Sequence, residues 1–163
     1  MKRILTLLSF IGFISFSGCT TTDDVDTIAI TYENAVPFNF VAPSFNVRFI
    51  FPTPILESDM VLVYRLDGID NGRDVWQSLP ETYFYDSGLW DFSFKYTFTN
   101  RYVDVYLDGF DNNNPIPLRY RANQTFRFVI VPANLVYAID TKNYLEVVSK
   151  LNIRENQIHD IKL

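Results

Sequence analysis

The chain has 163 residues, of which 17% are aromatic and 20% charged, and its formal net charge is −5. This excess of acidic residues argues against nucleic acid as a partner, because binding to phosphates requires a basic surface. It also argues against attachment to anionic lipid through charge alone.

The first eighteen residues have the layout of an export signal. Lys2 and Arg3 precede an uncharged, mostly apolar run over residues 4–16, and the small residues Ser17 and Gly18 then lead to Cys19. The apolar run is shorter than the roughly 20 residues that a membrane-spanning helix needs. We therefore predict a signal peptide over residues 1–18. Its removal leaves 12 Lys and Arg against 19 Asp and Glu, a formal net charge of −7.

The segment Phe16-Ser17-Gly18-Cys19 resembles the bacterial lipobox, except that Phe16 stands where leucine is usual. The resemblance implies that the mature chain begins at Cys19 and that fatty-acyl chains such as palmitate anchor it to a membrane. Two or more acyl chains hold a protein stably, whereas one holds it weakly. The alternative is a free cysteine beside an ordinary cleavage site. Cys19 is the only cysteine, so the sequence offers no intrachain disulfide and no cysteine metal cluster.

Residues 19–26 are polar and acidic, which is typical of a solvated tether. The segment resembles the acidic export tag of Bacteroidota lipoproteins, which implies the outer membrane and its cell-surface side; the periplasmic side is the alternative. Asp26-Thr27-Ile28 resembles an O-glycosylation site of the same phylum, which makes Thr27 a candidate glycan acceptor. The alternative is that Thr27 only opens the first strand.

Apolar and polar residues alternate with a period of two along much of residues 27–163, and this predicts a single β-domain. Strands are expected over 28–32, 45–51, 60–66, 92–98, 102–107 and 126–130, with 81–85 as an added edge. In 60–66 both faces are apolar, which predicts a central strand. About seven strands at short spacing favour an Ig-like antiparallel β-sandwich.

Residues 143–151 break this rhythm, because Tyr144, Leu145, Val148 and Leu151 recur at helical spacing. Asn143 lies three residues before Glu146, a spacing typical of a helix N-terminal cap. We predict one short helix that packs against an end or edge of the sandwich. A last strand is expected within residues 155–163.

Two strands run into acidic loops that contain glycine, at 67–74 and at 108–113. Oxygen-rich loops of this kind can bind calcium, with Asp67, Asp70, Asp108 and Asp111 as the candidate ligands. The EF-hand spacing fails, however, because Ile69 and Ser78 would occupy ligand positions. We favour the interpretation that these residues serve the turns, in which Asp, Asn and Gly adopt left-handed geometry. No cofactor or metal is expected.

Residues suited to catalysis are sparse. His159 is the only histidine, it lies close to the C-terminus, and its sequence neighbour Asp160 would point to the opposite face of a strand. A glycosidase with paired carboxylates stays open, because acidic residues are plentiful. Most of them, however, lie in loops and turns. We therefore expect a protein that is not an enzyme.

Trp76 and Trp90 are the candidates for a ligand platform. Both lie in or beside loops rather than inside clean strands, with several tyrosines nearby. Exposed aromatic side chains can stack on sugars or form the centre of a protein interface. The alternative is that each tryptophan covers one end of the core.

Residues 58–133, in particular 59–66, 76–84 and 126–133, resemble a group of small flavobacterial surface lipoproteins without an assigned activity. The resemblance covers about half of the chain and implies a surface lipoprotein, but it implies no functional residues. We expect a membrane-anchored protein with a non-catalytic binding or structural role at the cell envelope, whose partner is a glycan or an envelope protein. The alternative is a carbohydrate-binding or glycan-processing accessory protein with a carboxylate-based site.

Overall fold

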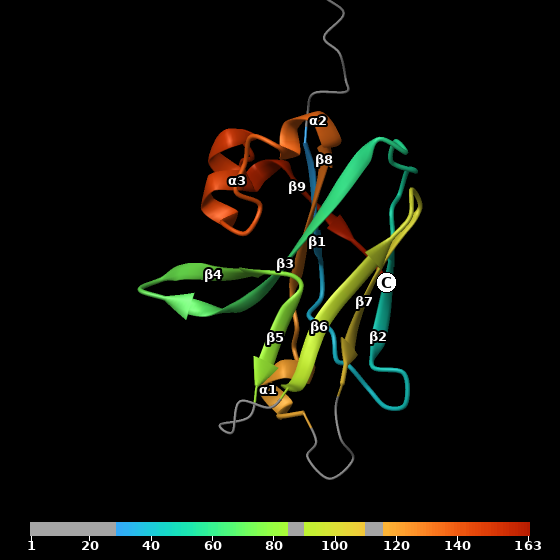
Figure 1. Cartoon of the computed structure of the whole chain (residues 1–163). Helices are drawn as coiled ribbons and strands as arrows, with labels where there is room; N and C mark the ends of the chain where they lie inside the picture. Colours follow the sequence, from blue (N-terminus) through green and yellow to red (C-terminus); the bar gives the residue numbers. More distant parts are fainter. Residues whose placement is uncertain (1–28, 85–89, 110–115) are drawn as a thin grey trace, which may run out of the picture.

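The computed structural model describes residues 29–84, 90–109 and 116–163 and shows two β-sheets packed face to face (Figure 1). The five-stranded sheet has the order β4-β3-β8-β1-β9 and consists of β1 (Ile30–Asn34), β3 (Asp59–Asp70), β4 (Arg73–Ser78), β8 (Phe126–Pro132) and β9 (Ile158–Ile161). The four-stranded sheet has the order β2-β7-β6-β5 and consists of β2 (Asn46–Ile50), β5 (Glu81–Phe84), β6 (Trp90–Phe98) and β7 (Tyr102–Asp108). The predicted all-β sandwich is confirmed.

The strands of the described residues number nine, where the periodicity indicated about seven. The edge strand expected near residues 81–85 is β5, and the last strand expected within 155–163 is β9. Each has only four residues, which is too short for alternation to stand out. Strand β9 pairs with β1 in parallel, whereas every other ladder is antiparallel.

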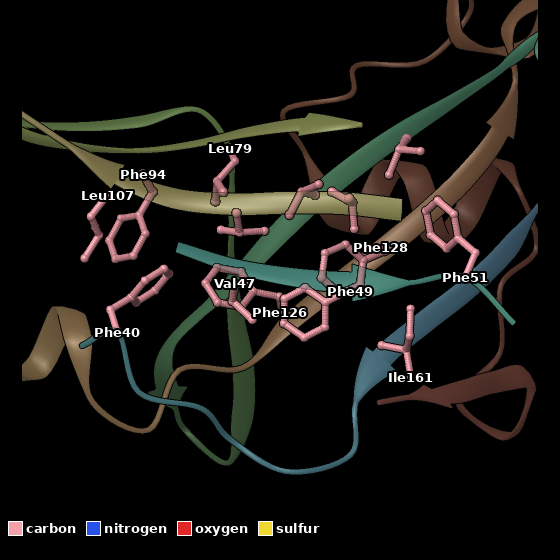
Figure 2. Packing of buried hydrophobic residues seen from close by; sticks show 14 of the residues in the cluster. Phe40, Val47, Phe49, Phe51, Leu79, Phe94, Leu107, Phe126, Phe128 and Ile161 are labelled. Carbon is pink, nitrogen blue, oxygen red and sulfur yellow. The ribbon is translucent and has the colours of Figure 1, made fainter. Parts of the chain in front are cut away.

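The main core lies between the two sheets and is rich in phenylalanine (Figure 2). The alternating positions of each strand supply it, as the period of two requires. The ring centroids of Phe49 on β2 and Phe128 on β8 lie 4.8 Å apart, and Phe126 packs beside both. The buried side chains from the strands include Val47, Phe92, Phe94, Val103, Val105, Leu107 and Ile130.

A second core covers the outer face of the five-stranded sheet. Leu62 and Tyr64 of β3, with Val129 and Val131 of β8, pack there against Tyr144 and Val147 of helix α3 (Tyr144–Lys150). Strands β3 and β8 are therefore buried on both faces, which confirms the prediction of a central strand at 60–66. The helix was expected at an end or edge of the sandwich; it contacts the edge strand β4 but also covers the outer face of the sheet. The apolar outer face of β3 and β8 needs a cover, and α3 provides it.

Helix α3 begins at the predicted cap. Asn143 is extended, and its side-chain oxygen accepts a hydrogen bond of 3.3 Å from the backbone N–H of Glu146. The Glu146 carboxylate accepts from the backbone N–H of Asp140 instead of returning to Asn143. The other helical segments are short: α1 (Leu118–Arg121), α2 (Ala133–Val136) and a 3₁₀ turn at Glu155–Gln157.

The β3–β4 hairpin extends beyond the body of the sandwich (Figure 1). Its turn residues, Asn71 and Gly72, have φ angles of 48° and 77°. Positive φ at both central positions is the mark of a type I′ turn, for which Asn-Gly is the preferred pair. The acidic loop at 67–74 is thus largely a hairpin arm with a tight turn at its tip.

Two arginines are buried, one on each face of the five-stranded sheet. Arg127 on β8 lies beside Tyr64 on the outer face, and Arg65 on β3 lies beside Phe126 on the inner face. The Arg65 guanidinium donates to Glu81 at 3.0 Å, and it also donates to Asp67 and Tyr83. It thereby links β3 of one sheet to β5 of the other.

Arg127 joins four segments that are remote in sequence. Its guanidinium is paired with Glu33 of β1 and with Glu155 of the 3₁₀ turn, and it donates to the hydroxyl of Tyr144. It also lies 4.3 Å from the ring centroid of Trp76 on β4. Burial lowers the pKa of Arg127, but its hydrogen bonds to Glu155, Glu33 and Tyr144 raise it more strongly. The group therefore stays charged, and it holds the C-terminal segment on the sheet.

We predict that Arg127→Met lowers the free energy of unfolding by about 3 kcal/mol, because it leaves Glu33 and Tyr144 without their buried partner. The matched control is Arg48→Met. Arg48 makes a similar two-pronged pair with Asp104, but 52% of its side chain is exposed. Exposed pairs contribute little, so the control should unfold close to wild type in urea. Equal losses in the two variants would contradict the role given to Arg127.

Alkaline pH should destabilise the domain through its buried tyrosines. Burial is the main cause that raises the pKa of Tyr64 above its ordinary value of 10.0, and Tyr64 donates a 2.7 Å hydrogen bond to the Thr141 carbonyl. Because the raised pKa belongs to the folded state, Tyr64 contributes to the stability of the fold fully below pH 10. This contribution is lost as the pH rises above 10. Each such tyrosine lowers the free energy of unfolding by up to about 1.4 kcal/mol for each pH unit in this range.

The variant Tyr64→Phe should therefore show a shallower loss of stability between pH 10 and 11.5, measured by urea unfolding at each pH. It should also be less stable at pH 7 by about 1 kcal/mol, since one buried hydrogen bond is gone. Tyr137→Phe is the control, because Tyr137 is 93% exposed. A slope unchanged by Tyr64→Phe would show that the alkaline loss has another origin.

Candidate functional site

Several residues singled out from the sequence lie outside the described residues. These are the lipid-attachment candidate Cys19, the glycan candidate Thr27 and the acidic residue Asp111. Trp90 opens β6, where it pairs with Phe84 of β5, and only its backbone is described.

The other calcium candidates are not brought together. Asp67 and Asp70 belong to the β3 arm of the hairpin, and Asp108 ends β7 in the other sheet. Asp67 accepts a hydrogen bond from Arg65, and Asp108 is paired with Lys95. Within the described ranges, no group of three or more His, Cys, Asp or Glu side chains is placed to hold a metal ion.

His159 lies on the edge strand β9 and is exposed. Its ring centroid is 5.9 Å from that of Tyr32, its partner in the parallel ladder with β1. Asp160, the next residue, is also exposed and pairs with Glu33 in the same ladder. His159 therefore packs beside an aromatic ring on an open edge.

Trp76 packs against the second core and also borders a surface groove. It lies on β4 opposite Leu66 of β3, is half-buried, and packs against the second core. The Arg127 guanidinium contacts its indole, and the ring centroid of Tyr144 lies 5.5 Å away. The remaining part of Trp76 borders a surface groove, so the residue both covers a core and presents an aromatic side chain.

The Trp76 groove lies between β4 and the segment that leads into α3, and its volume is about 440 Å³. Its lining combines aromatic and aliphatic side chains with acidic, amide and basic groups, and we call these polar groups the rim. The lining residues are Asp74, Val75, Trp76, Asp140, Lys142, Asn143, Tyr144 and Leu145. An apolar pocket with a few polar groups is the usual form of a small-molecule site.

The rim segment 140–143 is fixed by its own hydrogen bonds. An Asp140 carboxylate oxygen accepts from the backbone N–H of Lys142 at 3.0 Å, and the Asn143 side chain caps α3. The carbonyl of Thr141 accepts from the buried Tyr64 hydroxyl. One wall of the groove is thus tied to the sheet through Tyr64, and the other wall belongs to the hairpin arm.

Two side chains at the groove, Tyr144 and Arg127 behind it, each have a single charge state near neutral pH. Burial raises the pKa of Tyr144 above its ordinary value, although the hydrogen bond from Arg127 partly lowers it. Tyr144 is therefore a neutral phenol near neutral pH. Behind it, the charge of Arg127 is balanced by Glu33 and Glu155. The groove offers an aromatic surface with hydrogen-bond donors and acceptors around it, which suits the binding of an amphipathic ligand.

Arg127 is the residue of this region that the sequence prediction missed. Its signal was present, because it lies between Phe126 and Phe128 in a strand predicted to be largely apolar. A charged side chain in such a position is rarely buried unless it is paired. Its partners, however, are 94 and 28 residues away along the chain, so no local pattern could name them.

Among the helices of the described ranges, none has the length and hydropathy to cross a membrane. Comparisons of the chain with protein-family models, with curated proteins and with solved structures gave no match. The candidate site therefore rests on the geometry around Trp76.

Proposed function

We propose that this chain is a lipid-anchored protein of the cell envelope that binds a ligand without chemical conversion, and that the Trp76 groove is its binding site. One observation carries the choice of site. Trp76 is contacted by Arg127, which does not line the groove, and it borders the groove together with Tyr144.

The N-terminal sequence supports the anchor. A positive start, an apolar run and small residues before Cys19 are what a lipoprotein signal requires. Nine residues lie between Cys19 and Ala29, the first described residue, so a fully extended chain between the two spans at most about 35 Å. The domain would stand close to the membrane that holds its lipid, with the outer membrane and its surface side as the proposed location and the periplasmic side as the alternative.

Binding is favoured over catalysis by the state of the polar groups in the groove. Asp140 uses a carboxylate oxygen to order its own loop, and Asn143 uses its oxygen to cap a helix. The groove contains neither histidine nor cysteine among its lining residues. The groove offers a fixed aromatic surface with polar groups around it. Because this surface is already ordered, little free energy is lost when a ligand binds.

The anchor predicts a clear fractionation result. Wild-type protein should stay in the membrane fraction after a sodium carbonate wash and should be released by detergent, because acyl chains are buried in the bilayer. The Cys19→Ala variant should be released by the wash, as measured by immunoblotting. Protease treatment of intact cells then separates the two locations, since only a surface domain is cleaved. A variant that stays in carbonate-washed membranes would contradict lipid anchoring at Cys19.

The binding site predicts a second result, measured with protein released from its anchor. Purified Cys19→Ala protein should co-sediment with unwashed cell envelopes, and adding Trp76→Ala should lower the bound fraction at least tenfold, as expected for the loss of a central aromatic contact. The control is Ile69→Ala, since Ile69 is 72% exposed on the same hairpin and does not line the groove. Equal binding by the two variants would show that the groove is not the site.

A further inference from the structure

We infer that the Trp76 groove takes a neutral saccharide, with the indole of Trp76 as its stacking surface. This inference rests on the proposed function only in using the same groove as the binding site. It follows from three properties of the groove: an immobilised aromatic ring, a rim with both donors and acceptors, and the charge of that rim.

The aromatic ring is immobilised before any ligand arrives. Arg127 does not line the groove and is almost fully buried, so its contact at 4.3 Å reaches the indole from the protein side. Two carboxylates and the Tyr144 hydroxyl hold the guanidinium in turn. A rigid aromatic side chain supplies contact area at little cost in side-chain entropy. The C–H face of a sugar ring is flat and apolar, and it matches such a surface.

The rim matches the edge of a sugar ring. Each hydroxyl of a saccharide both donates and accepts, so a site for it needs both kinds of partner. Carboxylates at Asp74 and Asp140 accept, and the ammonium of Lys142 donates. All three side chains are exposed at the groove. A purely apolar ligand such as an acyl chain would leave these charged groups next to hydrocarbon, which is costly.

The charge of the rim selects among saccharides. Two carboxylates and one ammonium leave the groove with a formal charge of −1. An acidic polysaccharide or a phosphorylated ligand would meet net repulsion there, and the acidic balance of the whole chain adds to it. A neutral saccharide avoids this repulsion and still gains charge-assisted hydrogen bonds from its hydroxyls, which are stronger than neutral ones.

Fluorescence of Trp76 tests the inference directly. The chain has two tryptophans, so Cys19→Ala protein that also carries Trp90→Phe has Trp76 as its only one. This protein is titrated with pentasaccharides of glucose (α-1,4 and β-1,4), mannose, xylose, galactose and N-acetylglucosamine. At least one of them should give a saturable change in emission, because stacking alters the surroundings of the indole.

Variants of the rim carboxylates test whether hydrogen bonds, and not stacking on Trp76 alone, hold the saccharide in the groove. Asp74→Asn and Asp140→Asn should each raise the Kd for the bound pentasaccharide about tenfold, as expected for weakening a charge-assisted hydrogen bond. Asp70→Asn is the matched control, because it removes a charge from the same hairpin outside the groove and should leave the Kd unchanged. Calorimetric titration of Trp76→Ala, with its fold checked by circular dichroism, should show no binding.

The outcomes distinguish this inference from the proposed function. If no pentasaccharide binds but Trp76→Ala still lowers envelope binding, the ligand is not a neutral saccharide and the proposed binding site stands. If a pentasaccharide binds with the same Kd to Trp76→Ala, or if the rim variants match Asp70→Asn, the saccharide site lies elsewhere and the inference is overturned.

Discussion

The buried guanidinium of Arg127 is the interaction on which much of this structure depends. It lies on the outer face of the five-stranded sheet and contacts groups from β1, β4, α3 and the 3₁₀ turn before β9. A charge in this position must be satisfied on several sides, because an unpaired buried charge is strongly destabilising. Satisfying it fixes the orientation of the C-terminal segment and, through Trp76, the shape of the groove. Arg127 thus connects the packing of the C-terminal segment to the shape of the candidate site.

The parts of the fold that the sequence predicted are those in which local pattern and burial agree. Alternation located β2, β6, β7 and β8 because each has one apolar face or two, and Asn143 marked the start of α3 because a cap acts within one turn. The pairing of β9 with β1 could not be predicted, since it joins Ile158 to Thr31 across most of the chain. The position of α3 over β3 and β8 also depends on a non-local match between apolar faces.

The candidate site was predicted in part. Trp76 was identified from its residue type and its place near a turn, but the sequence left open whether it belonged to the core or to a ligand surface. In the fold it packs against the second core, and it also borders the groove between the edge strand β4 and the segment that leads into α3. Of the rim residues, Asp140, Lys142 and Asn143 come from the segment before α3, and only the folded arrangement brings that segment beside the hairpin.

The position of β1 has a mechanical consequence. It is the first strand of the described domain, and it lies between β8 and β9 with ladders on both sides. A force applied to the chain before Ala29 reaches the fold at β1, where the hydrogen bonds of both ladders resist it. Resistance to pulling is governed by the rate of unfolding rather than by equilibrium stability. A load borne between the N-terminus and the hairpin arm would therefore pass across the five-stranded sheet, from β1 through β8 and β3 to β4.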